Sequence, residues 1–140
     1  MNKIVLVTGA SRGIGLEVAK LFSKEGYKVI GTSRGDFNLG DLIGDSSAMS
    51  VQLDLMSKDS INDLFEVLKS KDILPSVLIN NSGITKDQLF LRMKDKDWDE
   101  VIETNLNGLF RVTKALIKPM VKNKFGRVIN ISSVAGLMGN

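Results

Sequence analysis

The sequence predicts an α/β fold of the doubly wound class, in which a mostly parallel sheet carries helices on both faces. Two observations predict it. Short apolar runs alternate along the 140 residues with stretches whose apolar residues recur at helical spacing. Small or polar residues follow each of the five runs, where ligands bind in sheets of this class. No repeat or linker interrupts the pattern, so we expect one domain over residues 1–140.

The first part of the pattern contains two strands around one helix. Residues 3–8 (KIVLVT) form a continuous apolar run, as expected for a buried parallel strand. Apolar residues recur at helical spacing over residues 14–22, and Gly26 suits the end of that helix. Residues 28–32 (KVIGT) predict the second strand. Because residues 35–47 are rich in Gly, Asp and Ser, we expect a loop or one short helix there.

Three further strands and two helices complete the predicted fold. The strands are expected over residues 49–53, 76–80 and 126–132. The first helix begins at Ser57, a residue type that caps helix N-termini, and carries one apolar face over residues 61–68. The second helix is long, over residues 97–122, and Pro119 is expected to kink or end it.

The composition excludes several kinds of catalytic site. The chain has no cysteine and no histidine. It therefore has no disulfide, thiolate nucleophile, Ser-His-Asp triad or Cys-ligated zinc. We expect no metal centre, and any acid–base chemistry near neutral pH must use tyrosine, lysine, carboxylates or bound water.

The charge and hydropathy of the chain limit the kinds of partner that it can have. Its net charge of +3 comes from lysines that are spread along the chain, which indicates a solvated surface rather than a nucleic-acid site. A mildly basic face still suits an acidic partner. No apolar run approaches the roughly 20 residues of a membrane helix, and the N-terminal run is too short for a signal peptide. We therefore expect a cytoplasmic protein without a membrane or nucleic-acid partner.

A glycine-rich turn, VTGASRGIG at residues 7–15, joins the first strand to the first helix. Such a turn lets a phosphate approach the backbone, where free N–H groups and the helix dipole favour negative charge. A merely tight loop is the alternative interpretation. The context of strand, turn, helix and second strand favours a dinucleotide site.

The end of the second strand distinguishes between the two nicotinamide cofactors. An acidic residue there would bind the ribose 2′-hydroxyl of NAD, whereas a basic residue suits the 2′-phosphate of NADP. This chain has Ser33 and Arg34 at that point, with no acid before Asp36, and Arg12 adds a cation on the same side. Two solvated surface charges are the alternative. Together the arginines favour NADP(H).

Four motifs resemble the short-chain dehydrogenase/reductase family. They are TGASRGIG at 8–15, NNSG at 80–83, N-L-x-G at 105–108 and ISS at 131–133. Residues 83–115 and 125–140 are more similar still to the 3-oxoacyl-[acyl-carrier-protein] reductases of bacterial fatty-acid synthesis. The resemblance spans all 140 residues. It implies a Rossmann fold, with five of the family's usual seven strands present.

The resemblance also implies a cofactor site and part of a catalytic site. The glycine turn would hold the cofactor phosphates, the end of the second strand the 2′-phosphate, and the end of the third strand the adenine. The implied cofactor-binding residues are Gly9, Ala10, Ser11, Arg12, Gly13, Ile14, Gly15, Ser33, Arg34, Asp54, Leu55, Asn81, Ser82 and Gly83. Ser82 stands where the family usually has alanine, a change we expect to be tolerated.

Two residues would belong to the reaction itself. The resemblance implies that Asn105 holds a water of the proton relay and that Ser133 hydrogen-bonds the substrate carbonyl. The alternatives are structural. Asn105 would be a polar residue in mid-helix whose hydrogen bonds are all made within the protein, and Ser133 would be a loop serine without a role in the reaction. Asp54 is likewise either an adenine contact or a turn residue.

The sequence departs from the family where the proton donor is expected. The family's Y-x-x-x-K pattern, which follows the serine, does not occur in these 140 residues. The one tyrosine, Tyr27, lies at the start of the second strand and is expected to be structural. Asn105 and Ser133 are therefore half of a relay. The chain is part of a longer reductase, a truncation, or a cofactor-binding module that has lost its chemistry.

The resemblance implies NADPH-dependent reduction of 3-oxoacyl-[acyl-carrier-protein] to the 3-hydroxyacyl form, by a homo-oligomer that is usually a tetramer. Lys124, in a basic run just before the fifth strand, is the expected contact for the acidic carrier protein, with a solvated turn as the alternative. Rival functions are a non-catalytic NADP(H)-binding module and a short-chain reductase acting on another carbonyl. A methyltransferase is a weaker rival, because it would want an acid where Ser33 and Arg34 stand.

Overall fold

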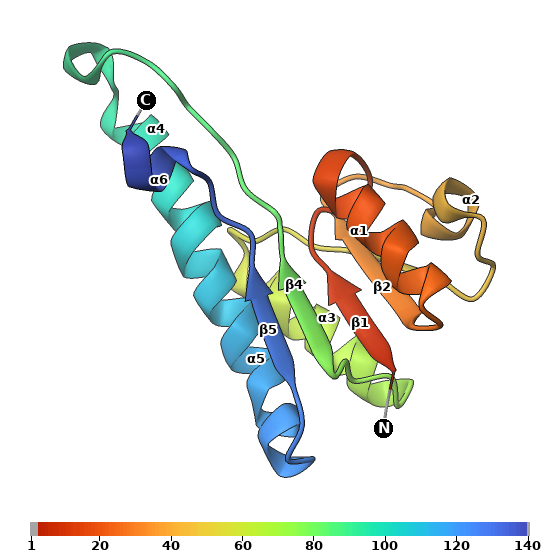
Figure 1. Cartoon of the computed structure of the whole chain (residues 1–140). Coiled ribbons are helices and arrows are strands. Elements are labelled where there is room, and N and C mark those ends of the chain that lie inside the picture. The colour runs from red at the N-terminus through yellow and green to blue at the C-terminus, as the bar shows by residue number, and fades with distance from the viewer. Residues whose placement is uncertain (1–2, 140) are drawn as a thin grey trace.

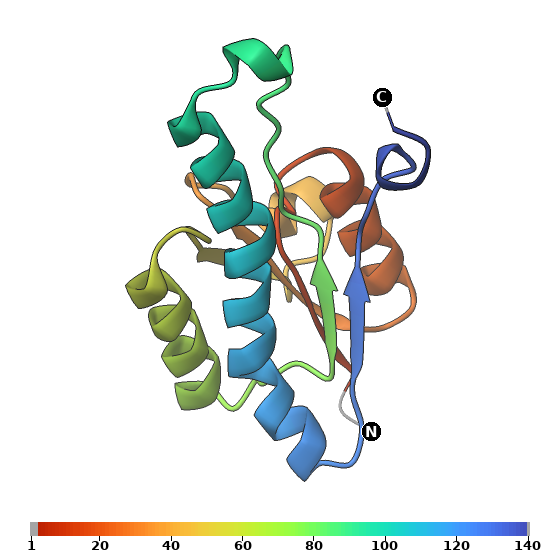
Figure 2. The ribbon, with the colours of Figure 1, turned by 90° about the vertical axis from the view of Figure 1, so that its left-hand side faces the viewer.

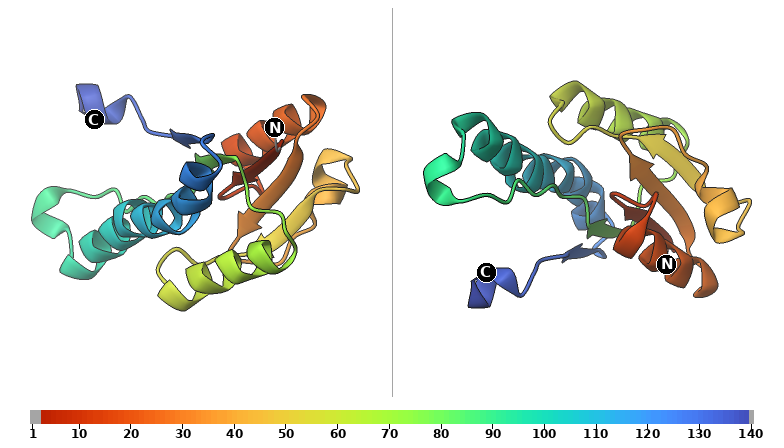
Figure 3. Two further views of the ribbon diagram at one scale, coloured as in Figure 1. Left: turned by 90° about the horizontal axis from the view of Figure 1, so that it is seen from below. Right: turned by 90° about the horizontal axis from the view of Figure 1, so that it is seen from above.

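The sheet of the computed structural model has five parallel strands in the order β3-β2-β1-β4-β5, with helices on both faces (Figure 1, Figure 3). The structure describes residues 3–139. This arrangement confirms the doubly wound α/β fold. In chain order the elements are β1 (Ile4–Val7), α1 (Gly13–Lys24), β2 (Lys28–Ser33), α2 (Leu39–Ile43), β3 (Met49–Gln52), α3 (Lys58–Ser70), β4 (Val77–Asn80), the 3₁₀ turn η1 (Phe90–Arg92), α4 (Asp95–Ile102), the π-helical turn η2 (Glu103–Gly108), α5 (Leu109–Lys122), β5 (Arg127–Asn130) and α6 (Ala135–Met138).

The core consists of two apolar layers, one on each face of the sheet. Ile4 and Leu6 of β1 face the layer under α3 and α5. Val5 and Val7 face the layer under α1 and α2. Because the strand is buried on both faces, it reads as a continuous apolar run rather than an alternating one.

The strand order reverses beside β1. From β1 the chain moves outward to β2 and β3, then returns to place β4 on the other side of β1. The register sets Val7 beside Gly31 of β2 and Ile79 of β4, so the three strands end close to one level. In open α/β sheets such a reversal leaves a crevice at the carboxyl ends of the strands.

Two helix starts follow the sequence closely. The 35–47 segment contains one short helix, α2, whose N-cap Asn38 accepts a hydrogen bond from the backbone N–H of Asp41 at 3.2 Å. Ser57 caps α3 by accepting from the N–H of Ser60 at 3.1 Å. Each cap satisfies a backbone donor that the helix itself leaves unpaired.

The long helix predicted over residues 97–122 ends at Lys122, as expected. It differs from the expectation because a π-helical turn, η2, interrupts it between α4 and α5. Pro119 lies inside α5 and does not end the helix. Leu116 and Met120, on either side of the proline, are both buried, and their packing holds the last turn against the sheet.

The β5 edge of the sheet is much more open than its centre. All four residues of β5 are exposed, and Val128 and Ile129 show 37% and 44% of their surface. The β4–α4 loop and the segment after β5 both extend beyond the carboxyl end of the sheet (Figure 2). Within residues 3–139, no helix has the length and apolar character needed to cross a membrane.

We expect the Asp45 carboxylate to stabilise the packing of α1 against the loop after α2. Hydrogen bonds from Ser47 and Ser23 hold the pKa of Asp45 below its ordinary value of 3.8. The stability that Asp45 contributes is therefore present above pH 3.8 and is lost as the pH falls through the lower folded pKa. Asp45→Asn should lower Tm by a few degrees at pH 7 and by less at pH 3. Asp36→Asn, at an exposed carboxylate, is the control, and an equal loss for Asp45→Asn at both pH values would contradict the expectation.

Candidate functional site

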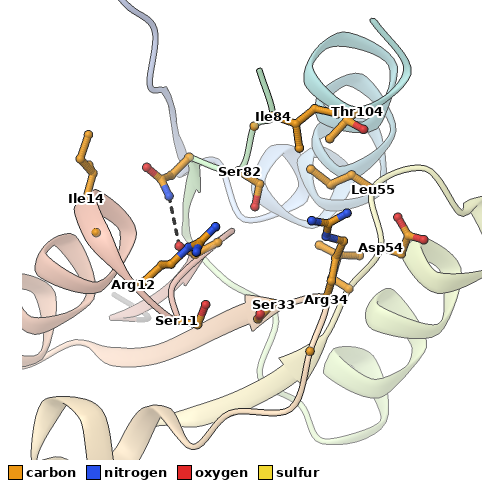
Figure 4. A pocket seen from close by; sticks show the side chains of 16 residues that line it. Ser11, Arg12, Ile14, Ser33, Arg34, Asp54, Leu55, Ser82, Ile84 and Thr104 are labelled. Carbon is orange, nitrogen blue, oxygen red and sulfur yellow. Dashed lines mark hydrogen bonds between the residues drawn. The ribbon is translucent and has the colours of Figure 1, made fainter. Parts of the chain in front are cut away.

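A cleft of about 500 Å³ opens at the carboxyl ends of β1, β2 and β4, where the strand order reverses (Figure 4). The glycine turn and the ends of β2, β3 and β4 form most of its wall, and the π turn adds one residue. The lining residues are Gly9, Ser11, Arg12, Gly13, Ile14, Ser33, Arg34, Gly35, Leu53, Asp54, Leu55, Asn81, Ser82, Gly83, Ile84 and Thr104. The structure therefore brings together residues from four separate segments that the sequence assigned to one site.

The N-terminus of α1 faces this cleft without a side-chain cap. Arg12 occupies the N-cap position with an extended backbone, and its side chain makes no capping hydrogen bond. The first turn of α1 contains no acidic residue either. Capping side chains are present at α2 and α3 but not at α1, whose start borders the cleft. Its free N–H groups and the positive end of the helix dipole can hold an anion.

Two glycines allow α1 to start this close to the sheet. Gly9 has a φ of +68°, in the left-handed region that favours glycine. A Cβ on Gly15 would lie 2.1 Å from the Gly9 carbonyl oxygen and 2.5 Å from Nδ2 of Asn81. Neither contact can be relieved, because one partner is backbone and the other is held by hydrogen bonds. A side chain at Gly15 would therefore push α1 away from the cleft.

The buried Thr8 hydroxyl joins the end of β1 to the segment after β4. Its Oγ1 accepts hydrogen bonds from the backbone N–H groups of Asn81 and Ser82, both at 3.0 Å. In return, Nδ2 of Asn81 donates to the carbonyl oxygens of Thr8 and Gly9 at 3.0 and 3.2 Å. Gly9, Asn81 and Ser82 all line the cleft. The Thr8 network therefore fixes the distance between the glycine turn and the segment after β4, which are the two central walls of the cleft.

Two arginines make one side of the cleft basic. Arg12 reaches in from the start of α1 and Arg34 from the end of β2, above the hydroxyls of Ser11 and Ser33 (Figure 4). The backbone of Arg34 is held in place because Nε2 of Gln52 donates to its carbonyl at 2.8 Å. One carboxylate, Asp54, lines the cleft beside them. Phosphate groups suit such a pair of guanidinium side chains.

Asp54 also has a local structural task. Its Oδ1 accepts a hydrogen bond from the N–H of Met56 at 3.0 Å, and its own N–H donates to Ser60 Oγ at 3.0 Å. Asp54 thus makes the turn between β3 and α3 while its side chain stays exposed at the cleft. Asp54 is therefore a turn residue, as one of the two interpretations expected, and the adenine contact that the resemblance implies stays a prediction compatible with this role.

Asn105 lies behind the cleft wall rather than in its lining. Its side-chain amide pairs with the backbone of Ile84: the Ile84 N–H donates to Oδ1 at 2.8 Å and Nδ2 donates to the Ile84 carbonyl at 2.9 Å. The Asn105 side chain therefore makes hydrogen bonds through both its amide oxygen and its amide nitrogen, and these hold the segment after β4 in place. That task and the predicted contact with a relay water are compatible, because each amide atom retains one unused hydrogen-bonding position.

The remaining predicted site residues, Ala10, Gly15, Ser133 and Lys124, do not line the cleft. Ala10 and Gly15 are buried beneath the lining, and the N–H of Ala10 donates to the Thr32 carbonyl at 2.9 Å. Ser133 lies on the exposed segment after β5, where its Oγ accepts from the N–H of Ala135 at 3.2 Å. Lys124 is exposed in the turn after α5, with a φ of +53°.

Several residues that shape the cleft escaped the sequence analysis. Thr8, Ile84 and Thr104 were not assigned to the site. Thr8 looked like the end of an apolar strand, yet a polar residue that is buried next to a glycine turn needs hydrogen-bond partners close by. The spacing of four that Thr104 shares with Gly108 and Val112 could have shown that it lies on the buried side of its helix, since all three are buried.

Comparisons with known proteins agree with this geometry. The model of the family described as short chain dehydrogenase matches residues 3–140. The chain belongs to the short-chain dehydrogenase family. This confirms the resemblance that the motifs indicated, and the cleft lies where the family's fold class places its ligands.

Within the short-chain dehydrogenases, the chain is similar to curated proteins of one kind, the 3-oxoacyl-[acyl-carrier-protein] reductases. The 3-oxoacyl-[acyl-carrier-protein] reductase FabG of Escherichia coli is 43% identical to this chain and covers 99% of it. The corresponding reductases of Vibrio cholerae and Synechocystis are 40% and 43% identical, each over 99% of the chain. The chain spans 58% of the length of these relatives.

We predict that Thr8→Val destabilises the protein although it preserves the shape of the side chain. The substitution leaves the N–H groups of Asn81 and Ser82 without their acceptor, at a cost of about 1–3 kcal/mol in the free energy of unfolding. Urea unfolding measures this loss. Thr8→Ser keeps the hydroxyl and should recover most of the difference. Equal stability of the valine variant and the parent would show that the hydroxyl holds nothing together.

Proposed function

We propose that this chain forms the NADP(H)-binding part of a 3-oxoacyl-[acyl-carrier-protein] reductase. The observation that carries the proposal is the pair of arginines, Arg12 and Arg34, at a cleft whose wall is an uncapped helix N-terminus. A dinucleotide with a pyrophosphate and a ribose 2′-phosphate has negative charge to match both features.

The residues present fit this cofactor. A Cβ at Gly15 would fill the space in which the turn of α1 closes on the sheet, which is the requirement of a backbone that cradles a phosphate. Arg34 follows β2 where an NAD site would carry an acid. When bound, the cofactor supplies the hydride. The chain's own residues bind and orient it.

Asn105 and Ser133 are proposed to serve the reaction. Asn105 holds the segment after β4 in position, and each of its two amide atoms keeps one hydrogen-bonding position for a relay water. Ser133, on the exposed segment after β5, is proposed to hydrogen-bond the carbonyl of a 3-oxoacyl thioester. The carrier protein that bears this thioester is proposed to dock near Lys124, where Lys122 and Arg127 add positive charge. The protein is proposed to work as a homo-oligomer.

A second candidate function is cofactor binding without chemistry. The one tyrosine of the chain, Tyr27, packs edge-on against Phe22 with 5.0 Å between ring centroids, and the Lys3 ammonium lies over its ring. Tyr27 precedes β2, at the opposite end of the strands from the cleft. It therefore has no access to a substrate at the cleft. A short-chain reductase for another carbonyl substrate is the third candidate, which the identities of 40–43% to the FabG relatives make less favoured.

Substituting Arg34 tests the cofactor assignment. Arg34→Ala should raise the Kd for NADPH about tenfold or more, because it removes a charge-assisted contact, and should change the Kd for NADH little. Titration of cofactor fluorescence measures both constants. Arg92→Ala, at an exposed arginine outside the cleft, is the matched control. Equal losses for NADPH and NADH would contradict the 2′-phosphate role, and no binding of either by the parent would overturn the proposed function.

A turnover assay tests whether these 140 residues carry out the reaction by themselves. We expect the chain by itself to bind NADPH but to oxidise it with a short 3-oxoacyl thioester only at the background rate, because Tyr27 cannot reach the cleft. The measurement is NADPH absorbance at high protein concentration, with Ser133→Ala as the comparison. Turnover above background that Ser133→Ala abolishes would contradict the expectation and would assign the chain a complete reaction.

A further inference from the structure

The π turn η2 (Glu103–Gly108) corrects a mismatch between the spacing of buried residues and the geometry of the α-helix. Buried residues recur at an interval of four along this segment: Thr104, Gly108, Val112, Leu116 and Met120. An α-helix has 3.6 residues per turn, so each step of four turns the buried side by about 40°. Over four steps the two ends would face directions about 160° apart. A π turn is wider, and one such turn brings Thr104 back to the side that α5 buries.

This turn supports the wall of the cofactor cleft at three points. Thr104 belongs to the lining itself. Asn105 holds the backbone of Ile84, which is also in the lining. A Cβ on Gly108 would lie 2.7 Å from Cβ of Leu55 and 2.8 Å from its carbonyl oxygen, so the turn also rests directly on the wall after β3.

A side-chain network spans the same turn outside the cofactor cleft. Glu103 accepts a hydrogen bond from Nδ2 of Asn107 at 2.5 Å and forms a hydrogen-bonded ion pair with Arg111. The three residues are partly buried. Helix-surface pairs ordinarily join residues three or four apart, whereas Glu103 and Arg111 are eight apart, with Asn107 between them. The network therefore ties the first residue of the π turn to the first full turn of α5.

The charge state of the network agrees with its geometry. Hydrogen bonds from Asn107 and Arg111 hold the pKa of Glu103 below its ordinary value of 4.5. Glu103 is thus ionised at neutral pH and able to hold both partners. Lys58 at the start of α3 adds a weaker attraction. A π turn is rare because its hydrogen bonding is less favourable than that of the α-helix, so a structure that keeps one needs such support.

We propose that Glu103, Asn107 and Arg111 are positioning residues for the cofactor cleft. They hold the π turn that sets Thr104, Ile84 and Leu55 in the cleft wall. The effect on the cofactor rests on the proposed function, but the effect on the wall does not. None of the three side chains lines the cleft, so they act through Asn105, Gly108 and the turn between them.

Amide hydrogen exchange at Ile84 tests the proposal without any cofactor, because this N–H donates to Asn105. Glu103→Ala and Arg111→Met should each speed the exchange of the Ile84 amide about tenfold and raise the Kd for NADPH about threefold to tenfold. The exchange of Leu6, in the centre of the sheet, should stay as in the parent. The double variant should resemble each single variant, because both substitutions break the same network. Glu66→Ala, which removes the exposed partner of Lys69, is the control and should change none of these values.

The outcomes separate this inference from the proposed function. An Ile84 amide that exchanges at the parent rate in both single variants overturns the positioning role. Equal acceleration at Ile84 and Leu6 also overturns it, because it would show general destabilisation. If the parent binds neither NADPH nor NADH, the proposed function fails, and the exchange at Ile84 alone then decides the positioning role. If the parent binds NADPH, faster exchange with an unchanged Kd overturns the link between the network and the cofactor.

Discussion

The close approach of the glycine turn to the end of β4 is the contact on which the site depends. Gly15 lies so near the Gly9 carbonyl and the Asn81 amide that no side chain fits between them. The Thr8 hydroxyl fixes the same junction from below, through the N–H groups of Asn81 and Ser82. With these contacts in place, the N-terminus of α1 is aimed at the cleft, and the helix dipole acts at the point where a phosphate would lie.

Most of the fold could be predicted from the sequence because strand and helix periods are local properties. The apolar runs, the Ser57 cap and the short helix after β2 all follow from neighbouring residues. The π turn could not be predicted in the same way, because a search for helical spacing assumes one fixed period. Of the two effects expected of Pro119, a kink or a helix end, the end does not occur, because burial of Leu116 and Met120, which tertiary packing decides, keeps the helix going to Lys122.

The sequence predicted more of the residues that line the cleft than of the residues that hold the cleft wall in place. The predicted cofactor-binding residues carry recognisable chemistry, such as the arginines and the glycine turn, and all of them except Ala10 and Gly15 line the cleft. Thr8, Ile84 and Thr104 support or complete the wall through contacts between segments distant in sequence, which no local pattern shows. The same holds for Asn105, whose partner Ile84 lies 21 residues earlier in the chain.

The cleft and the predicted reaction residue Ser133 lie in parts of the fold that differ in burial. The cleft is formed around β1 and β4, whose residues are buried, and the Thr8 network joins the ends of these two strands. Ser133 follows β5, whose residues are all exposed, and its hydroxyl is held by a single local hydrogen bond. Catalysis requires a reacting group to be held within a fraction of an ångström, whereas nucleotide binding tolerates more freedom at its edges. The contacts around β1 and β4 therefore hold the cleft wall together, whereas the reaction proposed at Ser133 would require further packing against β5 to hold the serine in place.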